Sequence, residues 1–211
     1  LIYSLPMTKK RLPEHIGFIP DGNRRWATGR GLHKEDGYQA GIEPGLDLFE
    51  ICRDLGIPEV SVYGFTQDNT RRPTRQTEAF RSSCTAFALE VFDRGASLLV
   101  VGDEQSVQFP NALKPFRQRQ GSGINVNFLV NYGWRWDLEA LKTTGQLHSH
   151  DVAPLDLVVR WGGGRRLSGF LPVQSVYADF YVVDDYWPDF APSQFEAALT
   201  WFREQDRTLG G

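Results

Sequence analysis

HIGFIPDGNRRWA, residues 15–27, joins a short apolar run to a polar turn and a segment compatible with a helix. The apolar run predicts a buried strand that ends before Pro20. Gly22 lets the backbone turn sharply and approach a ligand closely. The first N–H groups of the following helix have no partner within it, so an anion could accept hydrogen bonds from them. Asp21 beside such donors suits a divalent cation that bridges carboxylate and phosphate oxygens, although this tripeptide is also typical of a solvated tight turn.

Short apolar runs alternate with helical patterns along the rest of the chain. Ile42–Leu55 and Thr77–Phe92 have apolar side chains at helical spacing. Ser193 and Glu196 form a capping-box pattern that predicts the start of a last helix. This alternation predicts a single α/β domain over residues 1–211, with a central, mainly parallel six-stranded sheet flanked by helices. The predicted strands are Ile16–Ile19, Val60–Phe65, Ser97–Val101, Ile124–Val130, Leu155–Arg160 and Phe180–Val183.

The composition is that of an ordinary globular protein, with 41% hydrophobic and 23% charged residues. A formal net charge of −3 argues against a general nucleic-acid binder. Cys52 and Cys84 are too few for a disulfide framework and predict buried free thiols in a reducing compartment. No apolar run approaches the roughly 20 residues that span a bilayer, and the segment from Leu1 to Arg11 lacks the features of a secretion signal. We therefore expect a soluble cytoplasmic protein without stable membrane insertion.

Polar residues follow each of the first five predicted strands. In open parallel sheets, ligands bind outside the carboxyl ends of the strands. Arginine occurs in most of these segments, and its planar guanidinium matches the oxygens of a phosphate. The run Gly162-Gly163-Gly164 would let backbone N–H groups approach an anion. The shared position therefore predicts an anionic ligand, most simply a diphosphate, and the segments are residues 21–25, 66–73, 102–103, 131–135 and 160–168.

These motifs, in this order, resemble the cis-prenyltransferases, the undecaprenyl diphosphate synthase family. The resemblance runs through nearly the whole chain and rests on residues 15–27, 63–73, 131–133, 160–168, 177–181 and 187–190. It implies a homodimer with a parallel sheet and a hydrophobic tunnel beside the diphosphate site. It also implies a Mg²⁺-dependent condensation of an allylic diphosphate with isopentenyl diphosphate.

The resemblance also assigns roles to individual residues. Asp21 corresponds to the catalytic carboxylate that handles Mg²⁺ and diphosphate, and Asp179 stands where the family has a Glu that helps to hold the metal. Thr66 and Asn69 occupy catalytic positions linked to proton removal. The segment from Arg207 to Gly211 resembles a tail that reaches the partner's phosphate site. The substrate-binding positions are Gly22, Asn23, Arg25 and Lys34 for the allylic diphosphate, Arg160, Arg166 and Ser168 for the second diphosphate, and Trp26, Tyr38 and Arg72.

Several residues depart from the family pattern near these sites: Pro20, Lys34, Tyr38, Thr70, Trp161, Gly164, Gly169 and Asp179. The segments 73–102 and 137–156 also look shorter than in relatives that make polyprenyl chains, which suits a short tunnel. Such features resemble the members that make irregular, branched monoterpenes by joining two dimethylallyl diphosphates in a non-head-to-tail manner. The alternatives are a regular short-chain synthase and a non-catalytic subunit that binds prenyl diphosphates.

Two other motifs favour less specific interpretations. The aspartates Asp184, Asp185 and Asp189 superficially suggest the metal motif of trans-type prenyltransferases, but they follow a predicted strand and include Pro188, so we expect a surface turn. His148 and His150 lie in a predicted loop without a third ligand nearby, so we expect solvated side chains rather than a metal site.

Overall fold

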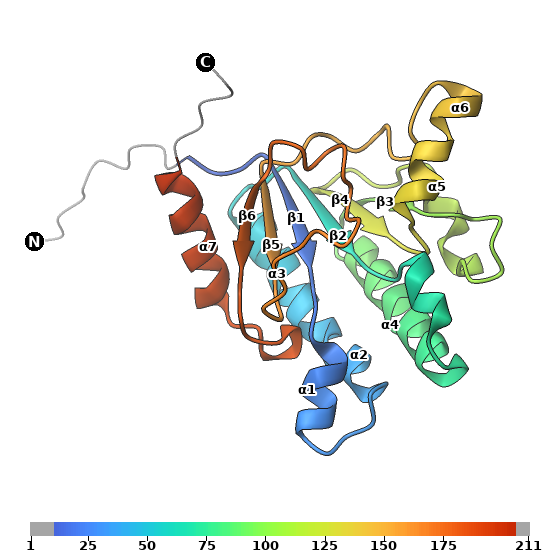
Figure 1. Cartoon of the computed structure of the whole chain (residues 1–211). Coiled ribbons are helices and arrows are strands. Elements are labelled where there is room, and N and C mark those ends of the chain that lie inside the picture. The colour runs from blue at the N-terminus through green and yellow to red at the C-terminus, as the bar shows by residue number, and fades with distance from the viewer. Residues whose placement is uncertain (1–10, 206–211) are drawn as a thin grey trace, which may run out of the picture.

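Six parallel strands form the centre of the molecule in the computed structural model, which describes residues 11–205 (Figure 1). Their order across the sheet is β3-β4-β2-β1-β5-β6, and every neighbouring pair is parallel. The strands are β1 (His15–Ile19), β2 (Glu59–Tyr63), β3 (Ser97–Val101), β4 (Asn125–Leu129), β5 (Leu157–Arg160) and β6 (Asp179–Val182). The fold class and all six predicted strands are therefore confirmed, with small shifts at the ends.

The helices connect and cover these strands. The α-helices are α1 (Asn23–Gly29), α2 (Asp36–Ala40), α3 (Ile42–Asp54), α4 (Thr74–Asp93), α5 (Trp134–Glu139), α6 (Leu141–Thr144) and α7 (Pro192–Glu204). Short 3-10 helices are η1 (Gln67–Arg71), η2 (Asn111–Arg117) and η3 (Trp187–Asp189). None of the helices within residues 11–205 is long and apolar enough to span a membrane.

The predicted capping box before the last helix is wrong in its register. Helix α7 begins at Pro192, and Ala191 is the residue that precedes it. The side chain that closes this end is Gln194, whose Oε1 accepts a hydrogen bond from the Ala191 N–H at 3.1 Å. Ser193 lies inside the first turn because proline, which lacks an N–H group, fits the first helical position.

The two faces of the sheet are covered differently. Helices α3, α4 and α7 pack on one face, where Phe49, Phe87 and Phe195 join the apolar side chains of the strands. The other face is covered by α5 and by the long connections around β5, with Phe170 and Leu171 fully buried. A Cβ at Gly17 would lie 2.4 Å from the Phe170 ring, so glycine lets this cover approach β1 closely.

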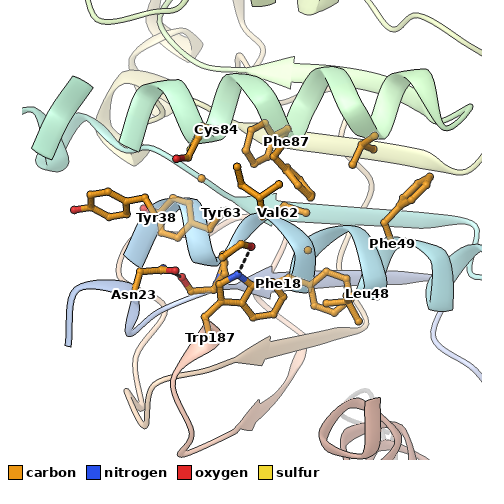
Figure 2. A pocket seen from close by; sticks show the side chains of 18 of the residues that line it. Phe18, Asn23, Tyr38, Leu48, Phe49, Val62, Tyr63, Cys84, Phe87 and Trp187 are labelled. Carbon is orange, nitrogen blue, oxygen red and sulfur yellow. Dashed lines mark hydrogen bonds between the residues drawn. The ribbon is translucent and has the colours of Figure 1, made fainter. Parts of the chain in front are cut away.

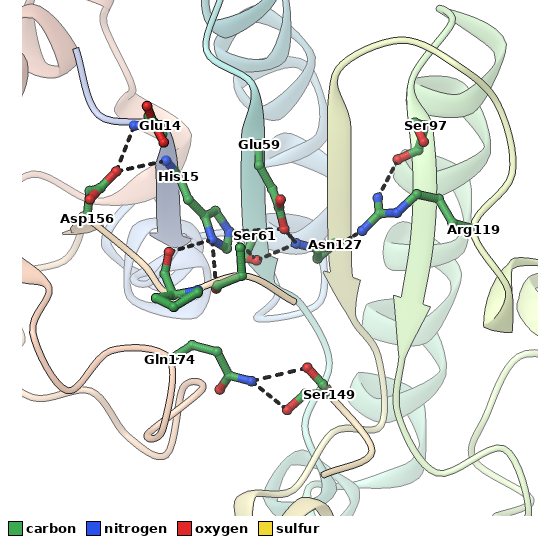
Figure 3. Close-up of polar contacts among 12 residues, drawn as sticks. Glu14, His15, Glu59, Ser61, Ser97, Arg119, Asn127, Ser149, Asp156 and Gln174 are labelled. Atoms are coloured by element: carbon green, nitrogen blue, oxygen red, sulfur yellow. Dashed lines mark hydrogen bonds and ion pairs between the residues drawn. The ribbon is translucent and has the colours of Figure 1, made fainter. Parts of the chain in front are cut away.

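A chain of polar contacts crosses strands β1, β2 and β4 in the amino-terminal half of the sheet (Figure 3). His15 Nε2 lies 2.8 Å from Ser61 Oγ, and Asn127 Nδ2 donates to Ser61 Oγ at 3.0 Å and to Glu59 Oε1 at 2.5 Å. Arg119 donates to Asn127 Oδ1 at 2.6 Å. Because His15 and Ser61 are buried and line neither of the cavities described below, we assign this network a structural role.

Candidate active site

A cavity of about 680 Å³ lies at the carboxyl ends of β1, β2 and β5. The chain goes from β1 to β2 on one side, whereas β5 pairs with the other side of β1. The crevice between such oppositely connected strands is where open α/β sheets bind ligands. The cavity therefore lies at the edge of the sheet where the sequence predicts an anionic ligand.

Most of the predicted site residues come together in this cavity. Its lining includes Asp21, Gly22, Asn23, Arg25, Lys34, Tyr38, Thr66, Asn69, Arg72, Arg160, Arg166 and Ser168. Six basic side chains in one cavity, Arg24 among them, suit a ligand with several negative charges. The geometry places these residues together without assigning their roles.

Asp21 lies between two arginines. Arg160 donates to Asp21 Oδ2 at 2.7 Å, and an Arg25 nitrogen lies 3.4 Å from the same oxygen. The Gly22 N–H donates to the other carboxylate oxygen at 2.6 Å. Burial raises the pKa of Asp21, but Arg160, the Gly22 N–H and Arg25 together hold this pKa below its ordinary value. The carboxylate is therefore charged at neutral pH.

Arg160 connects the Asp21 side of the cavity to the loop after β5. Its side chain is buried, and its Nη1 donates to the Arg166 carbonyl and, at 2.9 Å, to Ser168 Oγ. A Cβ at Gly164 would lie 2.7 Å from Arg160 Nε, so only glycine leaves room for this guanidinium. Arg160 Nε is buried without a hydrogen-bond partner among the described residues. This arginine therefore joins both predicted diphosphate-binding halves, whereas Arg166 is exposed.

The predicted use of the glycine N–H groups is wrong for Gly162 and Gly163. The Gly162 N–H donates to the Asp185 carbonyl at 2.7 Å, and the Gly163 N–H donates to the Val183 carbonyl at 3.1 Å. Both donors are thus occupied by backbone. The glycine at position 162 instead permits a positive φ of 82° and close contact with Arg25, which donates to its carbonyl at 3.0 Å.

Trp26 does not line the cavity, so the structure does not support its predicted contact with substrate. Its indole N–H donates to Asp189 Oδ1 at 2.7 Å, and the guanidinium carbon of Arg30 lies 4.4 Å from the centre of the ring. Arg30 also donates to Asp189 at 2.8 Å. The position of Trp26 follows from helical geometry, which turns successive side chains in different directions. Trp26 therefore attaches α1 to η3.

Asp179 lies at the other end of the sheet from Asp21. It begins β6 and pairs with Leu157, whereas Val182 pairs with Arg160. Three residues along a strand correspond to about 10 Å. Within one chain, the two carboxylates thus do not share a metal, which corrects the predicted metal pair.

Thr66 and Asn69 both line the cavity, but they also hold the local turn together. Asn69 Oδ1 accepts a hydrogen bond from the Thr66 N–H at 3.0 Å, across the start of η1. Asn69, which the resemblance links to proton removal, thus also shapes the segment that carries Arg72. The NH₂ group of the Asn69 side chain can still donate hydrogen bonds to a ligand, because only the side-chain oxygen is used in this contact.

An apolar cavity of about 70 Å³ lies beside the basic one, between the sheet and helices α3 and α4 (Figure 2). Its lining includes Phe18, Leu48, Val62, Cys84 and Phe87. Burial raises the pKa of the Cys84 thiol to about 12, so this cysteine acts as an apolar side chain. A small apolar chamber next to a basic cavity fits a ligand with a charged head and a short hydrocarbon tail.

The residues present fit a magnesium ion that is bound jointly by the protein and by a substrate diphosphate. Mg²⁺ usually keeps several waters and is bound by one or two carboxylates together with substrate phosphates. No group of three or more His, Cys, Asp or Glu side chains among residues 11–205 could hold a metal alone. Asp21 at the bottom of a basic cavity can supply one carboxylate, so the ion would bind here together with a diphosphate.

The other histidines and aspartates have local partners. His148 stacks on Trp136 with 4.0 Å between ring centres, and His150 lies 2.8 Å from the Leu147 carbonyl. Asp184 is exposed beside Arg165, and Asp185 accepts a hydrogen bond from Gln194 at 2.9 Å. These contacts agree with the predicted surface turn at residues 184–189.

Sequence reasoning missed several residues that line the basic cavity: Thr28, Tyr63, Asp68 and Phe80. Tyr63 ends β2 and Phe80 lies nearly two turns into α4, so each looked like an ordinary core position. The neighbouring loop residues offered a signal, because Asp68 lies between Thr66 and Asn69 at the same strand end. The predicted tail at Arg207, Gly210 and Gly211 lies outside the described residues.

The comparisons with known proteins agree with this geometry. A family model described as "Putative undecaprenyl diphosphate synthase" matches residues 19–210. The chain is 30% identical to a ditrans,polycis-undecaprenyl-diphosphate synthase ((2E,6E)-farnesyl-diphosphate specific) from Pectobacterium atrosepticum, over 94% of this chain and 90% of that protein. It is 28% identical to an isoprenyl transferase from Leptospira interrogans, over 96% of this chain and 97% of that one.

A solved structure gives the same fold. Lavandulyl diphosphate synthase from Lavandula x intermedia, in complex with dimethylallyl diphosphate, superposes with a TM-score of 0.79. The two chains are 22% identical, and the match covers 94% of this chain and 98% of the plant one.

Proposed function

The chain belongs to the undecaprenyl diphosphate synthase family, the cis-prenyltransferases, and is an enzyme that transfers prenyl groups. We propose that it condenses two molecules of dimethylallyl diphosphate in a non-head-to-tail manner, with cyclisation, to the branched ten-carbon cyclolavandulyl diphosphate. The observation that carries this proposal is the size of the apolar cavity. Its volume of about 70 Å³ is small beside the 680 Å³ of the basic cavity, which favours a short hydrocarbon tail over a polyprenyl chain.

The basic cavity supports the first chemical step. Loss of diphosphate from the allylic carbon leaves a carbocation and a highly charged anion, so catalysis depends on charges that are already in position. Arg25 and Lys34 supply positive charge near Asp21 for the leaving group. Magnesium bound with the diphosphate would add further positive charge to it. Apolar side chains such as Phe18 and Phe87 exclude water from the side where the cation forms.

The second diphosphate binds at the loop after β5 in this proposal. Arg166 and Ser168 line the cavity there, and Arg160 connects them to Asp21. The double bond of the second molecule is thereby held beside the cation, which turns the bond-forming step into a reaction between neighbouring groups. The released diphosphate is basic enough to accept the final proton in this proposal, and Asn69 and Thr66 line the cavity where they can orient the carbon that loses it.

A regular short-chain synthase that uses isopentenyl diphosphate is the second candidate. The names of the sequence relatives favour a regular synthase over an irregular one, but the undecaprenyl synthases among them are named for a long-chain product. The name of the plant neighbour, lavandulyl diphosphate synthase, favours the first candidate.

One incubation distinguishes these functions. The chain is mixed with Mg²⁺ and radiolabelled dimethylallyl diphosphate, with and without isopentenyl diphosphate, and the products are separated by carbon number. A ten-carbon product from dimethylallyl diphosphate alone supports the proposal. Strict dependence on isopentenyl diphosphate overturns it in favour of the regular synthase, and no product in either mixture favours a non-catalytic subunit.

The homodimer is part of the same proposal. Val173, Val176 and Tyr177 are exposed next to the edge strand β6, and such apolar clusters mark contact surfaces. Tyr177 is 75% exposed, so a Tyr177→Glu variant should fold as a single chain. Analytical ultracentrifugation of the wild type and this variant measures the outcome: a dimer that dissociates in the variant supports the proposal, and a monomeric wild type contradicts it.

A further inference from the structure

An aromatic ring supports one arginine of the basic cavity from outside. Tyr186 lies in the segment after β6, directly before η3, and lines neither of the two cavities. Arg25 lines the basic cavity, and its guanidinium carbon lies 5.0 Å from the centre of the Tyr186 ring. A ring at this distance attracts a guanidinium electrostatically. Tyr186 therefore reaches the candidate site through Arg25 and not by direct contact with a ligand.

The backbone on both sides of Tyr186 is held in place. The Gly162 N–H donates to the Asp185 carbonyl at 2.7 Å. The Trp187 N–H donates to the Asp21 carbonyl at 3.0 Å. These two bonds attach the segment to the loop after β5 and to the turn after β1, so the position of the ring is fixed by both.

The turn after β1 also packs directly against this ring. A Cβ at Gly22 would lie 2.7 Å from the ring atom Cδ1 of Tyr186. Gly22 has a positive φ of 103°, which a residue with a side chain rarely adopts. The glycine next to Asp21 therefore lets the turn lie against Tyr186, in addition to any approach it allows to a ligand.

Arg25 is exposed enough to need such support. Its side chain is 51% exposed, and its Nη2 donates to the Gly162 carbonyl at 3.0 Å and lies 3.4 Å from Asp21 Oδ2. The hydrogen bond that this side chain donates within residues 11–205 uses Nη2 alone, which leaves Nη1 and Nε for the oxygens of an anion. An arginine that moved freely would lose that freedom on binding, and this loss would weaken the complex.

We propose that Tyr186 is a positioning residue that preorganises Arg25 for the first diphosphate. The ring and the oxygens of Gly162 and Asp21 fix the guanidinium before the ligand arrives. The entropy of ordering this side chain is then lost during folding and not during binding. The inference rests on the proposed role of Arg25 in holding a diphosphate, and it adds a residue that lies outside the cavity.

The test is the dissociation constant of inorganic diphosphate, measured with Mg²⁺ by isothermal titration calorimetry. Tyr186→Leu removes the aromatic face but keeps an apolar side chain, so the dissociation constant should rise about fivefold. Tyr186→Phe keeps the face and loses only the hydroxyl. Its dissociation constant should stay within about twofold of the wild-type value.

A double-mutant cycle separates positioning of Arg25 from a general effect on the fold. Arg25→Ala alone should raise the dissociation constant by about tenfold or more, because a charged donor is lost. If Tyr186 acts through Arg25, adding Tyr186→Leu to Arg25→Ala should change the constant by less than about twofold. A merely structural role of Tyr186 would give the fivefold loss in both backgrounds.

Tyr181→Leu is the matched control. Tyr181 lies on β6, is half-buried like Tyr186, packs against Trp201 at 5.4 Å and lines neither cavity. This variant loses the same aromatic ring at a place without an arginine of the cavity, so its affinity for diphosphate should match the wild type. Circular dichroism checks that every variant is folded.

A folded Tyr186→Leu protein that binds diphosphate like the wild type overturns the inference. So does a fivefold loss that persists without Arg25 or appears equally in Tyr181→Leu, and so does a wild type that binds no diphosphate. These measurements need neither turnover nor a hydrocarbon tail. If the incubation shows strict dependence on isopentenyl diphosphate while the cycle behaves as expected, the proposed reaction fails and the role of Tyr186 stands.

Discussion

At the scale of single residues, Asp21 has more contacts than a surface carboxylate in a turn would have. Arg160 and Arg25 both approach one of its oxygens, and the Gly22 N–H bonds to the other. The sequence placed Asp21 correctly because it follows directly after a strand whose end was clear. It could not show that Arg160, 139 residues later, would be its partner, because that contact depends on the pairing of β1 with β5.

Asp21→Asn should lower kcat by about 100-fold or more, because it removes the charge at the centre of the cavity while keeping the shape of the side chain. Asp68→Asn is the control. Asp68 lines the same cavity but is exposed, and its ion-pair partner Arg71 lies 3.8 Å away. Its kcat should fall by less than about tenfold. Equal losses in the two variants, measured by steady-state kinetics, would remove Asp21 from the mechanism.

Gly164→Ala should weaken binding of the second diphosphate. The new Cβ would lie 2.7–2.8 Å from atoms of the buried Arg160 guanidinium and displace it. Loss of one charge-assisted hydrogen bond corresponds to an increase of roughly tenfold or more in the KM of that substrate. Gly29→Ala is the matched control, since nothing lies within 4 Å of the added carbon. An unchanged KM in Gly164→Ala would show that binding of the second diphosphate does not depend on the observed position of Arg160.

At the scale of elements, the 3-10 helix η3 fixes the segment that carries Asp21. The Trp187 N–H donates to the Asp21 carbonyl at 3.0 Å, and its indole N–H donates to the Gly41 carbonyl at 2.9 Å. Asp189 accepts hydrogen bonds from Trp26 and Arg30 on α1. Strand and helix periodicity predicted the elements on both sides, but a contact between two turns leaves no periodic pattern. The resemblance assigned Trp26 to the substrate, and no periodic pattern pointed to its contact with η3 instead.

Asp189→Ala should destabilise the protein by about 1 kcal/mol, because two hydrogen bonds at a partly exposed site are lost. For a domain of this size, the midpoint of thermal unfolding should fall by about 2–4 °C. Asp184→Ala is the control, because that carboxylate is exposed and pairs with an exposed arginine. Differential scanning calorimetry measures both variants, and equal midpoints would contradict a role of Asp189 in holding α1.

At the scale of the whole molecule, the sheet order explains which predictions succeeded. Six strands with clear ends were enough to predict the edge at which the cavity lies. Asp179 was misplaced because the motif gives its position in the chain but not the end of β6 at which it lies. The prediction that the N–H groups of Gly162 and Gly163 approach an anion was wrong for a similar reason, since the carbonyls that accept from them come from the segment after β6.

The polar network across the sheet should make folding stability depend on pH. Burial lowers the pKa of His15 below the ordinary value of 6.5, although the Glu59 carboxylate and two backbone carbonyls oppose this effect. Below pH 6.5, the unfolded chain therefore binds a proton that the folded chain does not, and stability falls with falling pH. The contribution of His15 to the free energy of unfolding is complete above pH 6.5 and decreases by at most about 1.4 kcal/mol per pH unit below it.

Urea unfolding at several pH values between about 7.5 and 5 measures this slope. His15→Gln should flatten the slope, because glutamine keeps hydrogen-bonding groups but does not titrate in this range. His148 also has a lowered pKa, mainly through burial, so His148→Gln serves as the comparison. A slope that is unchanged in His15→Gln would contradict the assignment.

In the proposed reaction, the buried position of Arg160 affects how a diphosphate binds. A guanidinium on the surface must give up its hydration shell before it can hold an anion in a dry site, and this desolvation weakens binding. Arg160 has already lost that shell during folding, with Asp21 as its counter-ion. An arriving diphosphate therefore meets a preorganised donor and exchanges one anionic partner for another. Under the proposed function, substrate affinity thus depends on the stability of the fold, so substitutions that stabilise the unliganded ion pair should slow the reaction.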